Sequence, residues 1–512
     1  MGSVRGAHSL FSSSRGPGPG RGASRGTSGS GPPARIRSAA APRGDDRRHR
    51  RSAPPPAGAA GRSPPDHLLG DRTLRRHDPG SQHRRGCRVG PRPGRRGGGR
   101  IHDRPGGNAV RLVAVTGAGV ISALGATAAA TWEGLVAGRS GIGPLTLFDA
   151  SKDRTHTAAQ ITSTEWDRGL TGAEQARLSR GDRLGLHAAG QAFADAGLDP
   201  SRFEASRAGL ILGGGGGGLL QAEAYLGAVL SGRAPKPSSA RGFFMGTTAD
   251  LIAQRFGLGG RVQTIMNACS SSTIAIGMGA SLVAGGAQEV VLAGGVETLS
   301  RTTFAGFNSL RLVDPDPCRP FDRRRRGMSL GECAAFLVLE PVEAARARGA
   351  RIYGEVAAYG MSSDAYHLTA PDPEGRGLQR SMRAALAAAG MSADDVDHVN
   401  AHGTGTEQND AAETRSLKGL FGARADRVPI VSIKGAVGHC LGAAGAIEAF
   451  ASLMSLVHGL IPPTTGLDEP GPDCDLDHVR GRAREARLRV VLSNSTAFGG
   501  NNGTLILKAH QA

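Results

Sequence analysis

Cysteine, aromatic residues and long apolar runs are all scarce in this 512-residue chain. Only 6 residues are cysteine, and no pair of them has the spacing of zinc ligands, which argues against a disulfide framework and a structural zinc site. We find no apolar run that approaches the length of a membrane helix or a signal peptide. The sequence therefore predicts a protein of the reducing cytoplasm with no membrane partner.

The first 108 residues lack lysine and glutamate, and Phe11 is their only aromatic residue. They hold 23 of the 62 basic residues and 6 of the 44 acidic ones, which leaves 39 basic against 38 acidic residues in the remainder. The basic character belongs to this segment, so it does not make the whole chain a nucleic-acid binder. Rich in Gly, Pro, Ser and Arg, the segment cannot bury enough apolar surface to offset chain entropy. We predict that residues 1–108 are a disordered, dispensable extension; a nucleic-acid-binding arm is the alternative.

The remaining body alternates short apolar runs with Ala- and Leu-rich helical stretches, which predicts an α/β fold with buried sheets. Strands are expected at 112–115, 210–212, 289–292, 335–339, 396–400, 428–432, 490–492 and 504–507. Helices are expected at 173–196, 270–285, 376–390, 409–420 and 441–458. A connecting region near 355–375 divides this body into two halves, residues 109–360 and 361–512.

Two glycine-rich segments resemble phosphate-binding loops only superficially. Gly117-Ala118-Gly119 follows the first predicted strand, but Ser122 stands where a dinucleotide fingerprint has its third glycine. The six glycines at 213–218 have no Lys-Ser/Thr behind them, as a P-loop would. We expect no nucleotide cofactor, and a flexible or tightly packed loop after a strand at 213–218.

Cys269 stands at the start of a predicted small-residue helix, where a thiol can become a nucleophile. A free thiol has a pKa of about 8.5, and a helix N-terminus can lower it by about 1.5 units. This position predicts a thiol that is close to half ionised at neutral pH. The alternative, and the commoner case for a lone cysteine, is a buried structural residue.

Three further segments place polar residues at strand ends beside glycines, where a ligand can approach the backbone closely. They are residues 400–406, 432–445 and 493–502, and they contain His402, Lys434, His439 and Phe498. Taken alone, a loop histidine more often packs or forms a structural hydrogen bond. Their combination with Cys269 points to a catalytic site.

Together these segments resemble the beta-ketoacyl-ACP synthases, a family of the thiolase-like superfamily. The resemblance spans residues 111–512 and includes Val113–Gly119, Ala268–Ser271 and Pro320–Asp322. It is strongest to the synthase II type and its polyketide relatives, which use Cys/His/His with a lysine. The resemblance implies a five-layered αβαβα fold built from two similar halves. It also implies a homodimer whose interface shapes the acyl pocket, a heterodimer being possible.

The implied reaction is a decarboxylative condensation of a Cys269-bound acyl chain with malonyl-ACP, giving 3-oxoacyl-ACP. Substrates are carried on the phosphopantetheine of acyl carrier protein, and no metal or other cofactor is implied. By resemblance, Cys269 carries the chain, and the backbone N–H groups of Cys269 and Phe498 form the oxyanion hole. His402 and His439 bind the malonyl carbonyl and stabilise the enolate. The supporting residues implied are Lys434 with its partner Glu448, Glu413, the pantetheine-binding Thr404 and Thr406, and Phe307, which lines the acyl pocket with Phe498.

The sequence departs from the family at three places. Residues 496–502 lack the aromatic residue that usually accompanies Phe498, Arg326 replaces a usual aspartate, and Cys333 replaces a usual glycine, where its volume is expected to strain the packing. These changes favour specialised polyketide metabolism over fatty-acid synthesis. The run Arg323–Arg326 either attracts an acidic carrier protein or forms internal salt bridges.

Two other functions stay open from the sequence. One is a non-catalytic, synthase-like partner subunit of the chain-length-factor type, although such subunits typically lack the nucleophilic cysteine. The other is a thiolase that acts on coenzyme A esters. A metal pair formed by His439 and Cys440 is disfavoured because adjacent side chains point in different directions and no further ligand stands nearby.

Overall fold

The computed structural model describes residues 111–511 except 168, 200–202 and 215. The predicted extension 1–108 lies outside the described residues.

A mixed sheet has the strand order β10-β9-β13-β14-β8-β1-β7-β6-β4-β5. Its strands are β1 Val113–Ile121, β4 Ala208–Gly213, β5 Val262–Ile265, β6 Val290–Glu297, β7 Cys333–Pro341, β8 Gly354–Ser363, β9 His398–Asn400, β10 Ile430–Val431, β13 Val490–Ala497 and β14 Asn501–Lys508. Two small ribbons pair β2 Gly143–Pro144 with β3 Thr157–Ala158, and β11 Leu460–Ile461 with β12 Arg484–Glu485.

The sheet consists of two copies of one topology. Numbered along the chain, the strands of each half lie in the order 3-2-4-5-1: β5-β4-β6-β7-β1 in the first and β10-β9-β13-β14-β8 in the second. In each half the strands numbered 3, 2 and 4 run parallel to one another. The strand numbered 1, which is β1 or β8, is antiparallel to its neighbours. The halves join through two residue pairs between β1 and β8. This repeat confirms the expected architecture of two similar halves.

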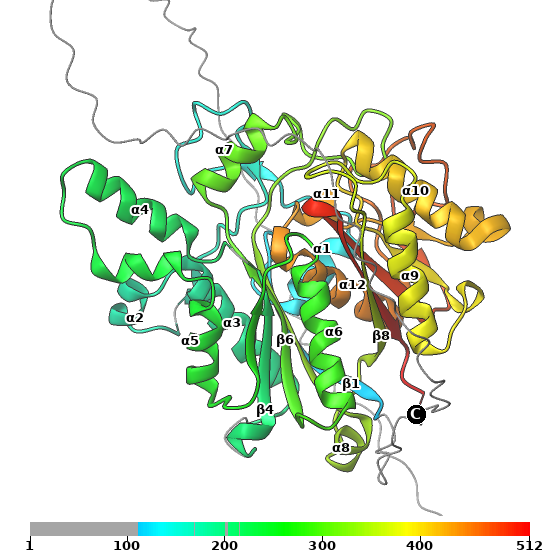
Figure 1. The fold of residues 1–512 in the computed structure, drawn as a ribbon, viewed down its shortest axis with the longest axis horizontal. Coiled ribbons are helices and arrows are strands. Elements are labelled where there is room, and N and C mark those ends of the chain that lie inside the picture. Colours follow the sequence, from blue (N-terminus) through cyan, green and yellow to red (C-terminus); the bar gives the residue numbers. More distant parts are fainter. Residues whose placement is uncertain (1–110, 168, 200–202, 215, 512) are drawn as a thin grey trace, which may run out of the picture. The chain divides into compact units, whose positions relative to one another are not determined.

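The helices complete five layers (Figure 1). Two buried helices, α6 Ser271–Ala284 and α12 Ala444–His458, pack against each other and against strands of both halves. Outside them, α3 Arg180–Asp195 covers β1 and β7, while α9 Arg376–Ala389 covers β8 and β14. The remaining helices are α1 Ala128–Val136, α2 Gly172–Arg177, α4 Leu219–Leu230, α5 Thr247–Phe256, α7 Arg301–Ser309, α8 Val342–Ala347, α10 Glu407–Phe421 and α11 Lys434–Val437.

Each strand predicted from the sequence overlaps an observed one, but the four short ribbon strands and two strands of the main sheet were missed. The main-sheet strands matter more for the architecture. They are β5, at the edge of the sheet, and β8, at its centre. The predicted connecting region 355–375 is therefore wrong in its first part, which is strand. The expected boundary between residues 360 and 361 falls inside β8, and the repeat of strand order starts the second half at Gly354.

Local sequence signals explain two further differences. The predicted helix 173–196 is broken into α2 and α3, because Thr171 and Ser179 each begin a helix with a capping box. Gly117 and Gly119 lie inside β1 rather than after it. A Cβ on Gly119 would come within 1.9 Å of the Ala188 carbonyl oxygen of α3, so these glycines permit close packing of helix on strand.

One segment contradicts the expectation that no apolar run reaches membrane length. Among the described residues, Leu441–His458 has the length of a membrane span and a mean hydropathy of 1.4 over 18 residues. It is 83% buried inside the fold, since it contains α12 between the two half-sheets. Its apolar character therefore follows from its place in the core.

Candidate active site

Cys269 lies in a tight turn between β5 and α6. Ala268, directly before it, has a φ of 47°, a left-handed conformation that L-residues other than Asn and Asp seldom adopt. The Ser271 hydroxyl holds the turn by donating to the Ala268 carbonyl at 2.6 Å and accepting from the Asn267 N–H at 2.8 Å. Cys269 is only 7% exposed.

Burial, rather than the helix N-terminus, dominates the ionisation of Cys269. Desolvation raises the pKa of the thiol to about 12, against the opposing effects of the nearby Lys434 ammonium and a hydrogen bond from the Phe498 backbone N–H. The expected half-ionised thiol is therefore wrong for the resting site. The thiol is protonated at neutral pH, and the two opposing groups stand ready to stabilise negative charge on the sulfur.

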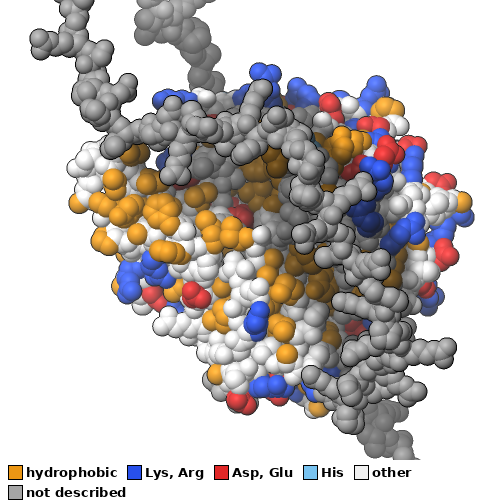
Figure 2. Space-filling view, viewed as in Figure 1, with side chains coloured by type: hydrophobic (Ala, Val, Ile, Leu, Met, Phe, Trp, Pro, Cys, Tyr) orange, Lys and Arg blue, Asp and Glu red, His pale blue; other side chains and the backbone are white. Residues whose placement is uncertain are grey.

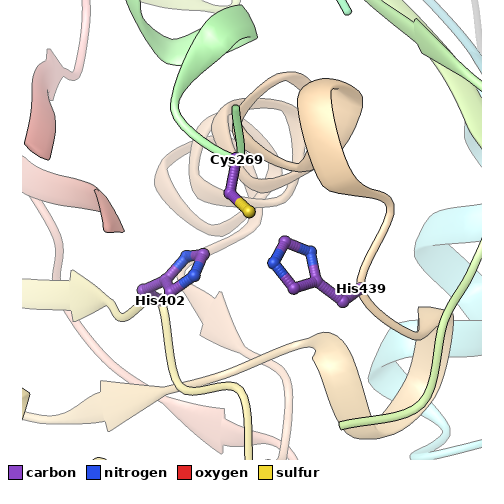
Figure 3. A group of neighbouring side chains, drawn as sticks. All are labelled: Cys269, His402 and His439. Atoms are coloured by element: carbon purple, nitrogen blue, oxygen red, sulfur yellow. The ribbon is translucent and has the colours of Figure 1, made fainter. Parts of the chain in front are cut away.

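Two histidines face the thiol from the second half of the chain (Figure 3). His402 follows β9, and His439 follows α11 after the turn at Gly438. The Cys269 sulfur and one ring nitrogen from each histidine all lie within 4.8 Å of one another. Burial, followed by the charge of Lys434, holds the pKa of both imidazoles well below the ordinary value. Both rings are therefore neutral at physiological pH.

The hydrogen bonds assign the same tautomer to both rings. The Nδ1 atom of His439 accepts from the Leu441 backbone N–H at 3.1 Å. The Nδ1 atom of His402 lies 3.2 Å from the Lys434 ammonium, which has no lone pair and can only donate. A neutral imidazole with an accepting Nδ1 carries its hydrogen on Nε2. Each ring therefore presents an N–H donor to the site, and the Nε2 of His439 has no hydrogen-bond partner among the described residues.

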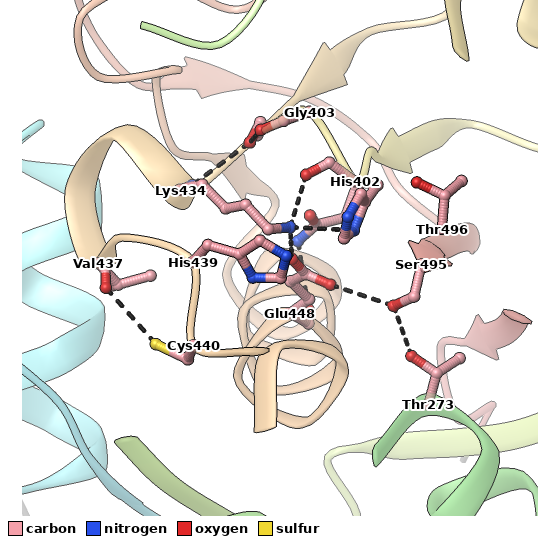
Figure 4. Close-up of polar contacts among 12 residues, drawn as sticks. Thr273, His402, Gly403, Lys434, Val437, His439, Cys440, Glu448, Ser495 and Thr496 are labelled. Carbon is pink, nitrogen blue, oxygen red and sulfur yellow. Dashed lines mark hydrogen bonds and ion pairs between the residues drawn. The ribbon is translucent and has the colours of Figure 1, made fainter. Parts of the chain in front are cut away.

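A buried ion pair supports this arrangement (Figure 4). Lys434 pairs with Glu448 of α12, as predicted, and also donates to the His402 carbonyl at 2.5 Å. Together with the contact to His402 Nδ1, these use all three hydrogens of the ammonium. Glu448 in turn accepts from Ser495, which shares a 2.6 Å hydrogen bond with Thr273 of α6. The network thus links both halves of the fold behind the two rings.

Glu413 fixes the loop that carries His402. Its carboxylate accepts from the backbone N–H groups of His402 and Gly403, each at 2.8 Å. Burial nevertheless raises the pKa of Glu413 to about 7, because desolvation outweighs these two hydrogen bonds. Glu413 touches backbone rather than the pocket, so it acts by positioning the loop.

The Cys269 sulfur and the two ring nitrogens lie close enough together for metal ligands. In the tautomers assigned above, the two rings direct hydrogens rather than lone pairs at the thiol, and a metal ion would have to displace them. Cys440 adds no ligand, since its sulfur contacts the Val437 carbonyl at 3.5 Å, away from the His439 ring (Figure 4). Cys333, the residue that replaces a glycine, lies buried beside the Cys440 thiol.

Two cavities, each of about 260 Å³, meet at Cys269, Phe307 and Phe498. The outer cavity contains both histidines and also Thr404 and Thr406, whose hydroxyls lie 2.9 Å apart. The inner cavity is mainly apolar and is lined by Leu219, Met266 and Leu441 among others. The Phe307 and Phe498 rings are 5.6 Å apart at the junction. The sulfur thus lies between a cavity that contains the polar side chains of the site and a second, mainly apolar cavity.

The arginine run forms internal ion pairs, the second of the two alternatives. Arg323 pairs with Glu469, Arg324 with Asp322 and Asp468, Arg325 with Asp410 and Asp473, and Arg326 with Asp314 and Asp316.

The described glycines of 213–218 lie tightly against neighbouring segments. A Cβ on Gly213 would lie 2.3 Å from the Ser272 nitrogen. This confirms close packing as the reason for those glycines.

Sequence reasoning missed two residues in and beside the site, Asn409 and Asp410. Asn409 accepts from the Thr496 hydroxyl at 2.7 Å, and both line the outer cavity. Asp410 anchors the neighbouring loops by accepting from the Phe321 and Gly405 N–H groups. The sequence signal that could have identified them is an Asn-Asp pair that begins three residues after Thr406, at the start of a predicted helix.

A buried thiol, two neutral imidazoles and a buried lysine meet in a duplicated five-layered fold, an arrangement typical of acyl-transferring enzymes of the thiolase-like superfamily. Family comparisons agree: residues 111–345 match the beta-ketoacyl synthase N-terminal domain, and 353–468 match the C-terminal domain. The chain therefore belongs to the beta-ketoacyl synthase family.

Curated relatives and solved structures cover the whole body of the chain. The chain is 38% identical over 411 residues to 3-oxoacyl-[acyl-carrier-protein] synthase 2 of Synechocystis sp., covering 78% of this chain and 99% of that protein. It is 39% identical over 412 residues to the putative polyketide beta-ketoacyl synthase 1 of Streptomyces halstedii, covering 78% and 98%. The ishigamide ketosynthase/chain length factor structure matches with a TM-score of 0.75 and 37% identity, covering 79% of this chain and 100% of that one.

Proposed function

We propose that Cys269 and the two histidines divide the condensation into two half-reactions. In the first, the Cys269 sulfur attacks an acyl thioester on acyl carrier protein, the carrier sulfur departs, and the thiol proton ends on it. The observation that carries this proposal is the convergence of the sulfur and both rings within 4.8 Å. The hydrogen bond from the Phe498 N–H to the sulfur supports the proposal that this N–H and that of Cys269 form the oxyanion hole.

In the second half-reaction, malonyl-carrier protein loses carbon dioxide and its remaining two carbons form an enolate. The inward N–H groups of His402 and His439 donate to the thioester oxygen on which the negative charge develops. The enolate carbon attacks the acyl-Cys269 carbonyl and expels the sulfur, which takes up a proton. The product is 3-oxoacyl-carrier protein. Neutral donors suit this step, because they stabilise charge without giving up a proton to the enolate carbon.

Intact-protein mass spectrometry after incubation with a panel of acyl-carrier proteins tests the first half-reaction. We expect one acyl mass on the wild-type chain and none on Cys269→Ala, while Cys474→Ala, which removes a buried thiol outside the site, still accepts the acyl group. An adduct that persists in Cys269→Ala would refute the proposal. Parallel incubation with coenzyme A esters distinguishes the thiolase alternative.

The comparisons support acyl carrier protein as the partner, since the name of the Synechocystis relative, 3-oxoacyl-[acyl-carrier-protein] synthase 2, includes it. They include both a 3-oxoacyl synthase and a polyketide synthase, and we assign this chain to polyketide-type chemistry. The assignment rests on the altered loop, in which the Thr496 hydroxyl contacts Asn409 where the family usually has an aromatic ring. The complete set of Cys269, His402, His439 and Lys434 favours catalysis over a non-catalytic partner role. We also keep the cytoplasm as the proposed location.

A second copy of the chain is the proposed occupant of an apolar face formed by α4 and residues 243–244, and of the free edge of β5. The exposed apolar side chains of this face gather over α4 (Figure 2); they are Leu226, Val229, Leu230, Phe243 and Phe244. β5 pairs only with β4 among the described strands, and Met266, which follows β5, is 59% exposed although it lines the inner cavity. A partner here would close that cavity.

Sedimentation of the purified chain should give twice the monomer mass, and Leu230→Glu should give monomers. A monomeric wild type would favour a non-identical partner.

A further inference from the structure

Two arginines lie at the rim of the outer cavity. Arg311 and Arg326 line it together with the catalytic histidines, Thr404 and Thr406. Backbone hydrogen bonds bring their segments together: the Gly327 N–H donates to the Gly405 carbonyl at 3.0 Å, and the Met328 N–H donates to the Leu312 carbonyl at 2.8 Å. The two guanidinium groups are thus held on loops that border the path to Cys269.

The donors of these arginines are only partly used. Arg326 contacts Asp314 at 3.2 Å and Asp316 at 2.6 Å, both through the same nitrogen, Nη2. Within the described part of the chain, its Nε and Nη1 groups donate no hydrogen bond, and the side chain is 54% exposed. Arg311 has no ion pair or side-chain hydrogen bond to any described residue. A guanidinium offers five donors, so several remain for a ligand.

Arg326 differs from the rest of its run. Arg325 is 5% exposed and lies between Asp410 and Asp473, while Arg323 and Arg324 pair with acidic residues outside the cavity. Of these four, Arg326 alone is among the residues that line the outer cavity. It is also the position at which the sequence replaces a usual aspartate, so the rim has gained positive charge where an acid is the usual residue.

We propose that Arg311 and Arg326 bind the phosphate of the phosphopantetheine arm while the thioester end reaches Cys269. The inference rests on the proposed function, because it concerns the same carrier-bound substrates. The arm is uncharged along its length apart from this phosphate, and guanidinium forks match phosphate oxygens. The carboxylates of Asp364 and Glu407 line the same cavity and repel the anion, which confines it to the arginine side. Arg311 and Arg326 then select substrates that carry the phosphate.

Small thioesters test this directly, because they can be made with and without the phosphate. We compare kcat/KM for acylation of Cys269 by acyl-phosphopantetheine and by acyl-pantetheine, and take the ratio within each variant. The wild type should prefer the phosphorylated arm by about 10- to 100-fold, the size expected for hydrogen bonds to a charged group. Arg326→Gln and Arg311→Gln should each lower this ratio, and the double variant should bring it close to one.

The matched control is Arg324→Gln, which removes an exposed charge of the same run outside the cavity and should leave the ratio unchanged. Since Arg326→Gln leaves the buried Asp314 without its partner, Arg326→Lys provides a variant that keeps a cation; its ratio should be intermediate. A folding defect lowers kcat/KM for both thioesters by the same factor, so it leaves the ratio between them unchanged.

Ratios equal to the wild-type value in all arginine variants would overturn the proposal, even if Cys269 is acylated normally. Failure of every thioester to acylate the wild type would instead refute the proposed function. Acyl-carrier protein and acyl-coenzyme A form the last pair of substrates. Loss of kcat/KM for the carrier in the double variant supports the assignment, whereas loss confined to the coenzyme A ester would contradict it.

Discussion

The two sides of the site respond to the same burial in opposite ways. On the side of the first half, burial raises the pKa of the Cys269 thiol; on the side of the second half, it lowers the pKa of both imidazoles. In each case burial disfavours the charged form. The resting pocket is therefore uncharged at its reacting groups, and its charge lies behind them in the Lys434–Glu448 pair. In the proposed mechanism negative charge arises only during the reaction, and the N–H donors that would stabilise it are already in place.

The largest effect is expected from removing the nucleophile. Cys269→Ala should lower condensation by at least about 10⁴-fold, since loss of a covalent nucleophile removes the whole acyl-enzyme route. Product formation from acyl- and malonyl-carrier protein measures this. Cys440→Ala, which removes a buried thiol next to His439, serves as control and should retain most activity. A comparable loss in both variants would remove the distinction between the two thiols.

Breaking the ion pair should destabilise the fold rather than only the reaction. Glu448→Ala leaves the Lys434 ammonium buried without its partner, and we expect the free energy of unfolding to fall by about 3–5 kcal/mol. Denaturant titration measures the change. Glu469→Ala breaks the exposed pair with Arg323 and should produce no comparable loss. Equal losses in the two variants would show that burial does not set the strength of the Lys434 pair.

Removing one imidazole should impair the second half-reaction selectively. His402→Ala or His439→Ala should lower condensation by about 10²–10³-fold, the usual cost of one oxyanion donor. The burst of free carrier thiol that accompanies acylation of Cys269 should stay stoichiometric in both variants. Loss of this burst would mean that the rings serve the thiol instead of the enolate.

The smallest effect concerns pH. Because the pKa of Cys269 is about 12, the thiolate fraction should rise about tenfold per unit across pH 7–9, and labelling by iodoacetamide should rise with it and reach no plateau. Mass spectrometry of the Cys269 peptide follows the rate. A plateau within this range would show that the helix N-terminus, and not burial, controls the thiol. The imidazoles, with lowered pKa values, should not add a step between pH 8 and 6.

Most of the fold was readable from apolar runs, and the exceptions have physical causes. β8 was missed because its sequence, Gly-Glu-Val-Ala-Ala-Tyr-Gly-Met-Ser-Ser, mixes small and polar residues, although pairing with β14 and β1 places it in the centre of the sheet. The break between α2 and α3 could have been predicted from the local sequence, since two capping-box patterns stand eight residues apart. For β8, long-range strand pairing overrides the local preference of the sequence, whereas for the helix break the prediction did not use a signal that was present.

The site residues were identifiable from their motifs, but their electrostatics were not. The sequence shows that Cys269 precedes a helix, and it does not show how deeply the thiol is buried, which reverses the direction of its pKa shift. The contact of Thr496 with Asn409 and the position of Arg326 at the cavity rim likewise depend on which loops the fold brings together. Such pairings join segments far apart in the sequence, so no local pattern reports them.

Decarboxylation of malonyl-carrier protein by Cys269→Ala tests the division of labour most directly. We predict that this variant, although unable to condense, still releases carbon dioxide at a rate comparable to that of the wild type, and that adding His402→Ala or His439→Ala lowers the rate by about 100-fold. Decarboxylation lost with the thiol alone, or unchanged when either ring is removed, would contradict it.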